Sequence, residues 1–407
     1  MKKDIFWNSL GTSAWSFLSL FLLIIVTRIN GIQASGLFSF AFAFAIIMFT
    51  VSCYGGRVYQ VSDHKRSFSS ETYIYLRLLT SLAVVIMTLL FVLLNSYDLH
   101  KSLLIFLLVG QRIFDAIADA LYGLMQKNNR LYISGKSLFY KSVFSLLVFA
   151  AIDFATRSLL LASLSLPLIS LLFIIFYDIP QSRKLENFTI KRKPDELNKI
   201  LKSTFTPFAI AAMGLVFVNI ARYFIDIYHP NLQGYFGIII MPLSLVILLF
   251  SFISTPAILH LSEKYNTKSF RELNRTVGKI FGITAAATIL ICTLMYFIGV
   301  PLLQLLFNVN FSAYIFDILL VILIGFTISI TSLFTNIAVI ARKLRFTAMT
   351  YIGANAILIL LCFLLVDRLQ IRGAVFAYVV ASAIHATAML AYYLYLTRYG
   401  QRLSIKS

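Results

Sequence analysis

The sequence predicts an all-α membrane protein with about 12 transmembrane helices in two six-helix lobes related by pseudo-two-fold symmetry. Three observations predict this class. Hydrophobic residues make up 60% of the 407 residues and charged residues only 13%, against about 25% charged residues in a soluble protein. The apolar residues gather in runs of about 20, the length that crosses a bilayer. A pattern of apolar and polar stretches also returns in the second half of the chain.

The repeated pattern begins with an apolar run that closes on polar residues. In the first copy, residues 14–26 lead to Thr27-Arg28-Ile29-Asn30-Gly31 and to a polar corner at 33–38, where we expect the chain to turn. In the second copy, residues 207–218 lead to a polar corner at 230–236. Arg28 stands eight residues before Gly36, and Asp226 stands eight residues before Gly234. Repeats of this kind are typical of transporters built from two equivalent lobes.

Each apolar run is expected to be a helix, because in lipid every backbone polar group must be satisfied within its own segment. The longest polar stretch separates the sixth run from the seventh. We therefore predict a first lobe at 1–178, a basic cytoplasmic linker at 179–203 and a second lobe at 204–407. The predicted spans are 7–29, 37–60, 73–95, 103–126, 132–153, 157–177, 205–227, 235–258, 278–299, 313–339, 345–366 and 373–396.

The net charge of +19 is distributed as topology requires. Of the 35 Lys and Arg residues, only Lys101, Arg157, Arg368 and Arg372 fall in predicted outer segments. Another 25 lie in the inner segments and the span ends beside them, on the side that carries the termini and the linker, and the remaining six lie inside spans. This positive-inside bias predicts that both termini are cytoplasmic. The basic residues are thereby explained without a nucleic-acid partner, and anionic membrane lipids are their expected neighbours.

Several function classes are excluded by what the chain lacks. The predicted outer loops are too short for an extracellular catalytic domain, and no complete phosphate loop or Ser–His–Asp set is present. Cys53, Cys292 and Cys362 all lie inside apolar runs, without metal-ligand spacing. We therefore expect no enzyme activity, no metal and no cofactor.

Six basic residues lie inside predicted spans, where a central charge costs roughly 2.5–3.5 kcal/mol and should face protein or water. Arg77 is one turn inside its span and is expected to snorkel to the membrane surface. Arg28 and Arg57 lie near span ends, so snorkelling and cavity lining both remain open for them. The six are Arg28, Arg57, Arg77, Arg112, Lys141 and Arg222.

The fourth span carries a polar stripe near the middle of the membrane. Arg112, Asp115, Asp119 and Gln126 share one helical face through their i, i+3 and i+7 spacings. Two interpretations are open: an internal ion pair that joins helices, or the wall of a water-filled cavity. Both require the stripe to face the protein interior. Lys141, equally deep in the fifth span, can pair with Asp115 or Asp119.

The seventh span repeats this spacing with Asn219, Arg222 and Asp226. We expect Arg222 to line a cavity and Asp226, nearer the outer end, to be its partner. Asn355 and His385 are single polar residues within later spans, and the histidine is expected to be a hydrogen-bonded packing residue.

These features resemble a known family. The first span closes on Thr27-Arg28-x-x-Gly31, followed by Ser35-Gly36-Leu37-Phe38, and Arg57 lies near the end of the second span. The hairpin at 123–130 reads Gly-Leu-Met-Gln-Lys-Asn-Asn-Arg. Together they resemble bacterial polysaccharide flippases of the O-antigen and capsule type, which carry lipid-linked oligosaccharides. Those flippases belong to the multidrug/oligosaccharidyl-lipid/polysaccharide (MOP) superfamily.

The resemblance implies a function for the cations. It implies transport of an undecaprenyl-diphosphate-linked glycan from the inner to the outer leaflet of the bacterial cytoplasmic membrane, by alternating access through a central cationic cavity. Arg28, Arg57 and Arg222 match positions where such proteins place cavity cations, and Asp226 departs from the pattern. Polysaccharide polymerase machinery is an implied partner. The expected substrate-binding residues are Arg28, Arg57, Arg112, Arg222, Asn219 and Lys141, and those for ion coupling or internal ion pairs are Asp115, Asp119 and Asp226.

Two alternatives remain open from the residues alone. A drug or organic-cation antiporter of the same superfamily would need an acidic, aromatic-lined cavity, whereas the deep charges of this chain lean basic. A membrane-embedded glycan polymerase would need a charged outer loop, and the outer loops here are short.

Overall fold

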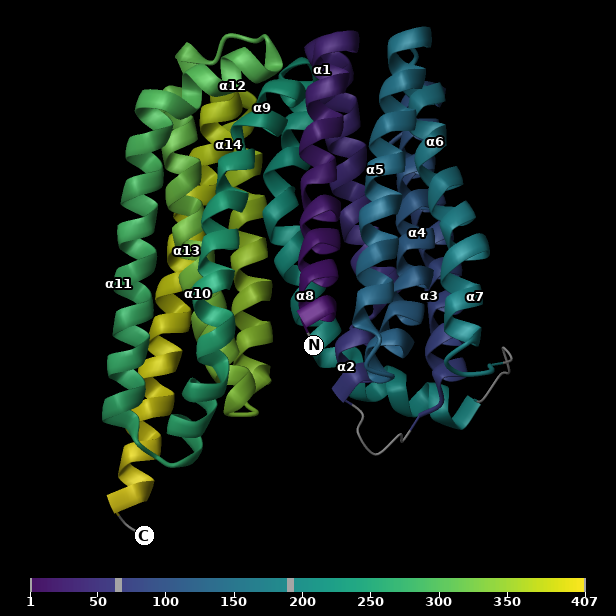
Figure 1. Ribbon diagram of the computed structural model, residues 1–407. Helices are drawn as coiled ribbons and strands as arrows, with labels where there is room; N and C mark the ends of the chain where they lie inside the picture. Colours follow the sequence, from purple (N-terminus) through teal and green to yellow (C-terminus); the bar gives the residue numbers. More distant parts are fainter. Residues whose placement is uncertain (1, 63–67, 189–193, 406–407) are drawn as a thin grey trace. The chain divides into compact units, whose positions relative to one another are not determined.

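The computed structural model describes residues 2–62, 68–188 and 194–405, and no strand occurs among them. The all-α prediction is confirmed (Figure 1). The α-helices are α1 (Lys2–Cys53), α2 (Gly56–Ser62), α3 (Ser70–Leu94), α4 (Leu99–Lys127), α5 (Leu131–Thr156), α6 (Leu159–Phe173), α7 (Ile179–Arg183), α8 (Pro194–Tyr228), α9 (Gln233–Ile239), α10 (Met241–Asn266), α11 (Phe270–Leu294), α12 (Val300–Phe307), α13 (Ile315–Ile340) and α14 (Leu344–Ile405). The π-helices η1 (Ile174–Asp178) and η3 (Met295–Gly299) and the 3-10 turns η2 (Pro230–Leu232) and η4 (Ser312–Tyr314) connect some of them.

The helices account for about 12 membrane crossings, as predicted. Within the described residues, 9 helices are long and apolar enough to span a bilayer. Two of these, α1 and α14, are each long enough to cross twice and bend near the middle. α4 falls outside that set because of its charges, yet its 29 residues match a full crossing. The protein is therefore a multi-pass membrane protein.

The bend in α1 lies at a single residue. Gly31 has φ 84°, a left-handed value that is costly for residues with a side chain. The Thr27 hydroxyl donates to the Ser35 hydroxyl over 2.8 Å and so ties the two halves together across the bend. The expected corner at 33–38 is itself helical, which corrects that prediction. One glycine replaces a turn of several residues.

The chain forms two compact units, Met1–Ala212 and Met213–Ser407, with the division inside α8. The start of α8 packs on the first unit. The Glu196 carboxylate accepts hydrogen bonds from the Ser69 and Thr72 hydroxyls, over 3.2 and 2.5 Å, at the N-terminus of α3. Ile200 is buried against Tyr73 of the same helix. The predicted lobe and linker boundaries stay predictions.

In the first unit, α4 contacts α1, α2, α3, α5 and α6, so its charges are enclosed by other helices. Close approach of α1 and α5 depends on glycine. A Cβ on Gly135 would lie 2.4 Å from the Trp7 backbone, which no side chain tolerates. The glycine therefore lets α5, with Lys141, lie against α1 and face α4.

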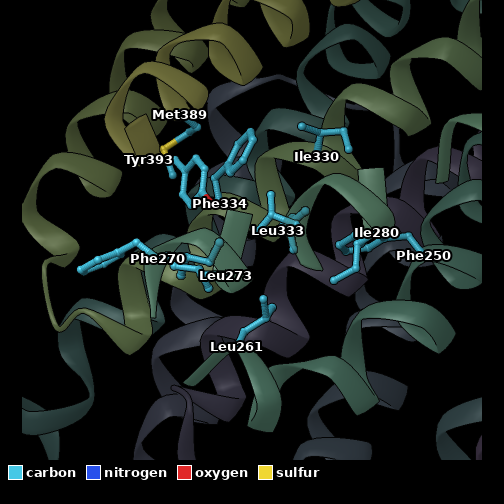
Figure 2. Close-up of a cluster of buried hydrophobic side chains, with 12 residues drawn as sticks. Phe250, Leu261, Phe270, Leu273, Ile280, Ile330, Leu333, Phe334, Met389 and Tyr393 are labelled. Atoms are coloured by element: carbon cyan, nitrogen blue, oxygen red, sulfur yellow. The ribbon is translucent and has the colours of Figure 1, made fainter. Parts of the chain in front are cut away.

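The second unit is held by an apolar cluster between α10, α11, α13 and α14 (Figure 2). Leu261, Leu273 and Leu333 are fully buried within it. Phe334 stacks on Tyr393 with ring centroids 5.2 Å apart. The interior of this part of the second unit is therefore almost purely hydrophobic.

Candidate functional site

The first unit encloses a charged cavity of about 200 Å³. We call it the charged cavity, and α1, α2, α4 and α5 all contribute to its wall. Its lining residues are Thr12, Trp15, Phe49, Arg57, Asp115, Asp119, Tyr122, Leu138 and Lys141.

Asp115 is clamped between two buried cations. Lys141 Nζ lies 2.6 Å from its Oδ1, and Arg112 Nη1 lies 3.0 Å from its Oδ2. Ser170 donates to Oδ1 over 3.3 Å, and Trp15 Nε1 donates to Oδ2 over 3.5 Å. A buried charge is tolerated only when it is paired and hydrogen-bonded, and this carboxylate meets both conditions.

Arg112 faces the protein interior with Asp115 in reach, which confirms that prediction. Its side chain is only 4% exposed. The guanidinium also lies over the rings of Trp15 and Phe42, 5.0 and 4.7 Å from their centroids. Aromatic faces attract cations, so the ring contacts help to compensate the lost hydration. Lys141 pairs with Asp115, one of the two partners expected for it.

Asp119, one turn further along α4, is also shared by two cations. Arg57 Nη1 lies 3.3 Å from Oδ1 and Arg77 Nη2 lies 3.3 Å from Oδ2. Arg57 additionally donates to the Gln126 side-chain oxygen through Nε and Nη2, over 3.3 and 3.2 Å. The predicted polar stripe of α4 thus serves two successive ion clusters.

The environment of Arg77 differs from the prediction. Arg77 was expected to snorkel to the surface, but its side chain is 1% exposed and reaches Asp119 and the Cys53 carbonyl. Its guanidinium fills the space beside Gly56, where a Cβ would lie 2.6 Å from it. Depth along one span does not show what packs beside it. The Gly55-Gly56 pair, which leaves room for a large group, was the available signal.

A second polar residue was missed by sequence reasoning. Asp178 is fully buried and accepts a 3.4 Å hydrogen bond from the Tyr122 hydroxyl, which also lies 2.9 Å from the Ser137 hydroxyl. It ends the π-helix η1, a form that often occurs at functional sites. Asp178 lies beside the predicted polar linker, so no feature of the sequence indicated that its side chain is buried. Tyr122 connects it to the charged cavity.

The charges around the cavity are not balanced. Four cations, Arg57, Arg77, Arg112 and Lys141, share the carboxylates Asp115 and Asp119. Counting the buried Asp178 as a third carboxylate still leaves the cations in excess. Arg57 and Lys141 line the cavity together with Asp115 and Asp119, whereas Arg77 and Arg112 contact the carboxylates without lining it. A cluster with an excess of one sign of charge attracts ions of the opposite sign.

Arg28 is not part of this group. It is an exposed residue of α1 that precedes the bend at Gly31, whereas Arg57 follows the far end of the same helix. The intervening helix of more than 20 residues separates the two by roughly 30 Å, at 1.5 Å per residue. Arg28 and Arg57 are therefore too far apart to contact the same small headgroup in this conformation.

The predicted polar residues of the seventh span lie in the second unit. Asn219 donates to the Leu215 carbonyl of its own helix over 2.8 Å. Arg222 is half-buried, and Asp226 is buried. That Arg222 shares a cavity with Arg57 stays a prediction, as does its pairing with Asp226.

The described residues contain no group of three or more His, Cys, Asp or Glu side chains that could hold a metal ion. Cys53, Cys292 and Cys362, which lie in the apolar runs, are free thiols.

No protein-family model matches the chain, and no curated protein matches it by sequence. Solved structures do match it. An inward-facing multidrug resistance MATE family transporter of the MOP superfamily has a TM-score of 0.73 at 11% identity, over 97% of this chain and 99% of the other. The lipid II flippase MurJ, in an inward closed conformation, has a TM-score of 0.72 at 13% identity, over 97% and 90%.

A third match has a distinct binding pocket. It is a MOP superfamily transporter from Pyrococcus furiosus with a binding pocket of reverse polarity. Its TM-score is 0.61 at 12% identity, over 98% of this chain and 95% of the other. All three matches extend over nearly the whole chain. The protein therefore has the fold of MOP superfamily transporters, as the resemblance implied.

Proposed function

We propose that the protein is a flippase that moves an undecaprenyl-diphosphate-linked oligosaccharide from the inner to the outer leaflet by alternating access. The observation that carries the proposal is the excess of cations around the charged cavity, where the buried Arg77, Arg112 and Lys141 and the partly exposed Arg57 share Asp115 and Asp119. A diphosphate supplies the negative charge that this arrangement lacks. Arginine suits it, because the planar guanidinium binds phosphate oxygens in a bidentate way.

Arg57 is the residue placed to meet the headgroup first. Its side chain is 26% exposed, whereas those of Arg77 and Arg112 are almost fully buried. Its contacts to Asp119 and Gln126 are 3.2–3.3 Å long and therefore looser than the 2.6 Å contact of Lys141. An incoming diphosphate can replace these partners at Arg57. Arg77 would then hold Asp119 alone.

Direction and location follow from charge. The strong positive-inside bias supports cytoplasmic termini in a bacterial cytoplasmic membrane. Outward movement of an anion with the usual inside-negative potential is favourable by roughly 2.3 kcal/mol per charge per 100 mV. The structurally similar MurJ is a lipid II flippase, which supports the substrate class. Polysaccharide polymerase machinery would act on the product.

A drug or organic-cation antiporter is a second candidate, and one observation favours it. The charged cavity is lined by the aromatic residues Trp15, Phe49 and Tyr122 together with two carboxylates, a composition that also binds organic cations. For that function a carboxylate must be released from its cation pair. The similar fold of the multidrug resistance transporter also supports this candidate.

The test is flipping by the purified protein in liposomes, with a fluorescent undecaprenyl-diphosphate oligosaccharide and an enzyme that cleaves only exposed glycan. Arg57→Gln should slow flipping by about 10- to 100-fold, because charged hydrogen bonds contribute roughly 1.5–3 kcal/mol. Arg57→Lys should keep partial activity, and Arg57→Glu should be slower than Arg57→Gln. The control is Arg130→Gln, an exposed arginine between α4 and α5.

Normal flipping by well-folded Arg57→Gln would rule out the cationic mechanism. The same liposomes, loaded with a fluorescent organic cation, address the second candidate. Cation export that is abolished by Asp119→Asn would favour the antiporter instead.

A further inference from the structure

The second unit carries an apolar groove of about 400 Å³ between α11, α13 and α14. Ile330 and Phe334 of α13 form part of its floor, and Phe281, Leu390 and Leu394 stand at its rim. The rim side chains are 41–44% exposed, so the groove opens on the surface of the unit. An apolar opening of this kind is suited to a lipid chain.

One end of the groove is polar. The Tyr393 hydroxyl donates a hydrogen bond to the Asn274 side-chain oxygen, and both residues line the groove. Tyr393 stacks on Phe334, as Figure 2 shows, so its ring is fixed. Asn274 lies one turn from the start of α11 at Phe270. The polar end therefore coincides with the end of the membrane span.

Glycine creates the open volume beside α11. A Cβ on Gly278, which lines the groove, would have nothing within 4 Å, and the same holds for Gly282 one turn later. This differs from Gly135 of the first unit, where the missing side chain admits a neighbouring helix. At Gly278 and Gly282 the space is unfilled by the described chain.

Three exposed cations lie on the same stretch of α11 as the groove residues Asn274 and Gly278. Arg271 precedes Asn274 by three residues, Arg275 precedes Gly278 by three, and Lys279 precedes Gly282 by three. Such spacings make them surface neighbours on the helix. Within the described residues none of the three forms a salt bridge, and Glu272, the acid nearest to them in sequence, is bridged by Lys264 at 2.6 Å.

We propose that the groove binds one acyl chain of an anionic phospholipid of the bilayer, with its phosphate held by Arg271 and Arg275. The chain would lie over Gly278 against Phe281 and Ile330, and the long stem of Lys279 would let its amine reach the headgroup. The positive-inside bias puts these cations at the cytoplasmic leaflet, whose anionic lipids attract basic residues. A second copy of this chain fits less well, because two such basic faces would repel each other.

The test is native mass spectrometry of the protein from detergent, with phosphatidylglycerol and phosphatidylcholine titrated in parallel. One tightly held phosphatidylglycerol is expected. Gly278→Leu should abolish it by filling the groove, without harm to the fold because the space is open. Gln substitution of Arg271, Arg275 and Lys279 should weaken retention by about fivefold per cation and remove the preference over phosphatidylcholine.

Two matched variants separate this site from general effects. Gly353→Leu adds the same side chain at another open, exposed glycine of α14 and should retain the lipid. Gln substitution of the exposed Arg183, Lys199 and Lys202 in the first unit removes equal charge and should also retain it.

Four results would overturn the proposal, and three of them come from the variants and lipids above. They are retention of phosphatidylglycerol by Gly278→Leu, equal retention of phosphatidylcholine by the unmodified protein, and dimers that Gly278→Leu dissociates. Displacement of the phospholipid by an undecaprenyl diphosphate at equal concentration would also do so. Because flipping is not measured, the outcome is independent of the flippase function.

Discussion

The fourth spans of the two units, α4 and α13, occupy equivalent places in the chain but carry different side chains on their buried faces. In the first unit, α4 carries Arg112, Asp115 and Asp119 on its inner face, and both carboxylates pair with cations on other helices. In the second unit, α13 presents Ile330, Leu333 and Phe334 to an apolar cluster. The first interior can hold a charged group, and the second resembles an ordinary hydrophobic core. The two ion clusters on Asp115 and Asp119 therefore have no counterpart in the apolar cluster around α13.

Breaking the ion cluster should give the largest effect on stability. Asp115→Ala leaves Lys141 and Arg112 buried without their carboxylate, which should cost about 3–5 kcal/mol of unfolding free energy. Thermal unfolding in detergent measures the loss. Adding Lys141→Met to Asp115→Ala should recover part of it, since one of the unpaired charges disappears. A double variant no more stable than the single one would contradict the clamp described for Asp115.

The counterpart in the second unit tests whether its interior depends on packing alone. Leu333→Ala should cost about 2–5 kcal/mol through lost burial and a cavity, because Leu333 is completely buried. Liposome flipping per folded molecule should be unchanged, since no charge is removed. Loss of flipping at full protein recovery would show that the second unit also takes part in substrate recognition.

The smallest effect comes from two glycines. Gly56→Ala places a methyl group 2.6 Å from the Arg77 guanidinium and should cost about 1–3 kcal/mol, as overpacking does. Gly353→Ala, in open space on α14, should change unfolding by less than about 1 kcal/mol. Unfolding of both variants under identical conditions measures the difference. Equal stability would mean that Arg77 moves aside freely.

Helical spacing predicted part of this contrast correctly. The one-face stripe from Arg112 to Gln126 and the pairing of Lys141 with Asp115 follow from periodicity and depth, which a single chain displays. Arg77 and Asp178 escaped because their burial depends on which helices pack beside them. Arg28 was grouped with Arg57 by resemblance, although a whole helix lies between them. The fold class was predictable because lipid demands helices of a set length.

The docking of α8 on the first unit has a consequence for biogenesis. Glu196 and Ile200 complete the surface around the N-terminus of α3, so that surface is finished only after residues 196–200 have been synthesised. A nascent chain emerges from its N-terminus, and domains usually fold in that order. Here the first half must wait for the end of the basic stretch. A fragment cut at residue 178 would leave Tyr73 and the start of α3 uncovered. During synthesis of the full chain, the insertion machinery would have to shelter them until residues 194–203 arrive.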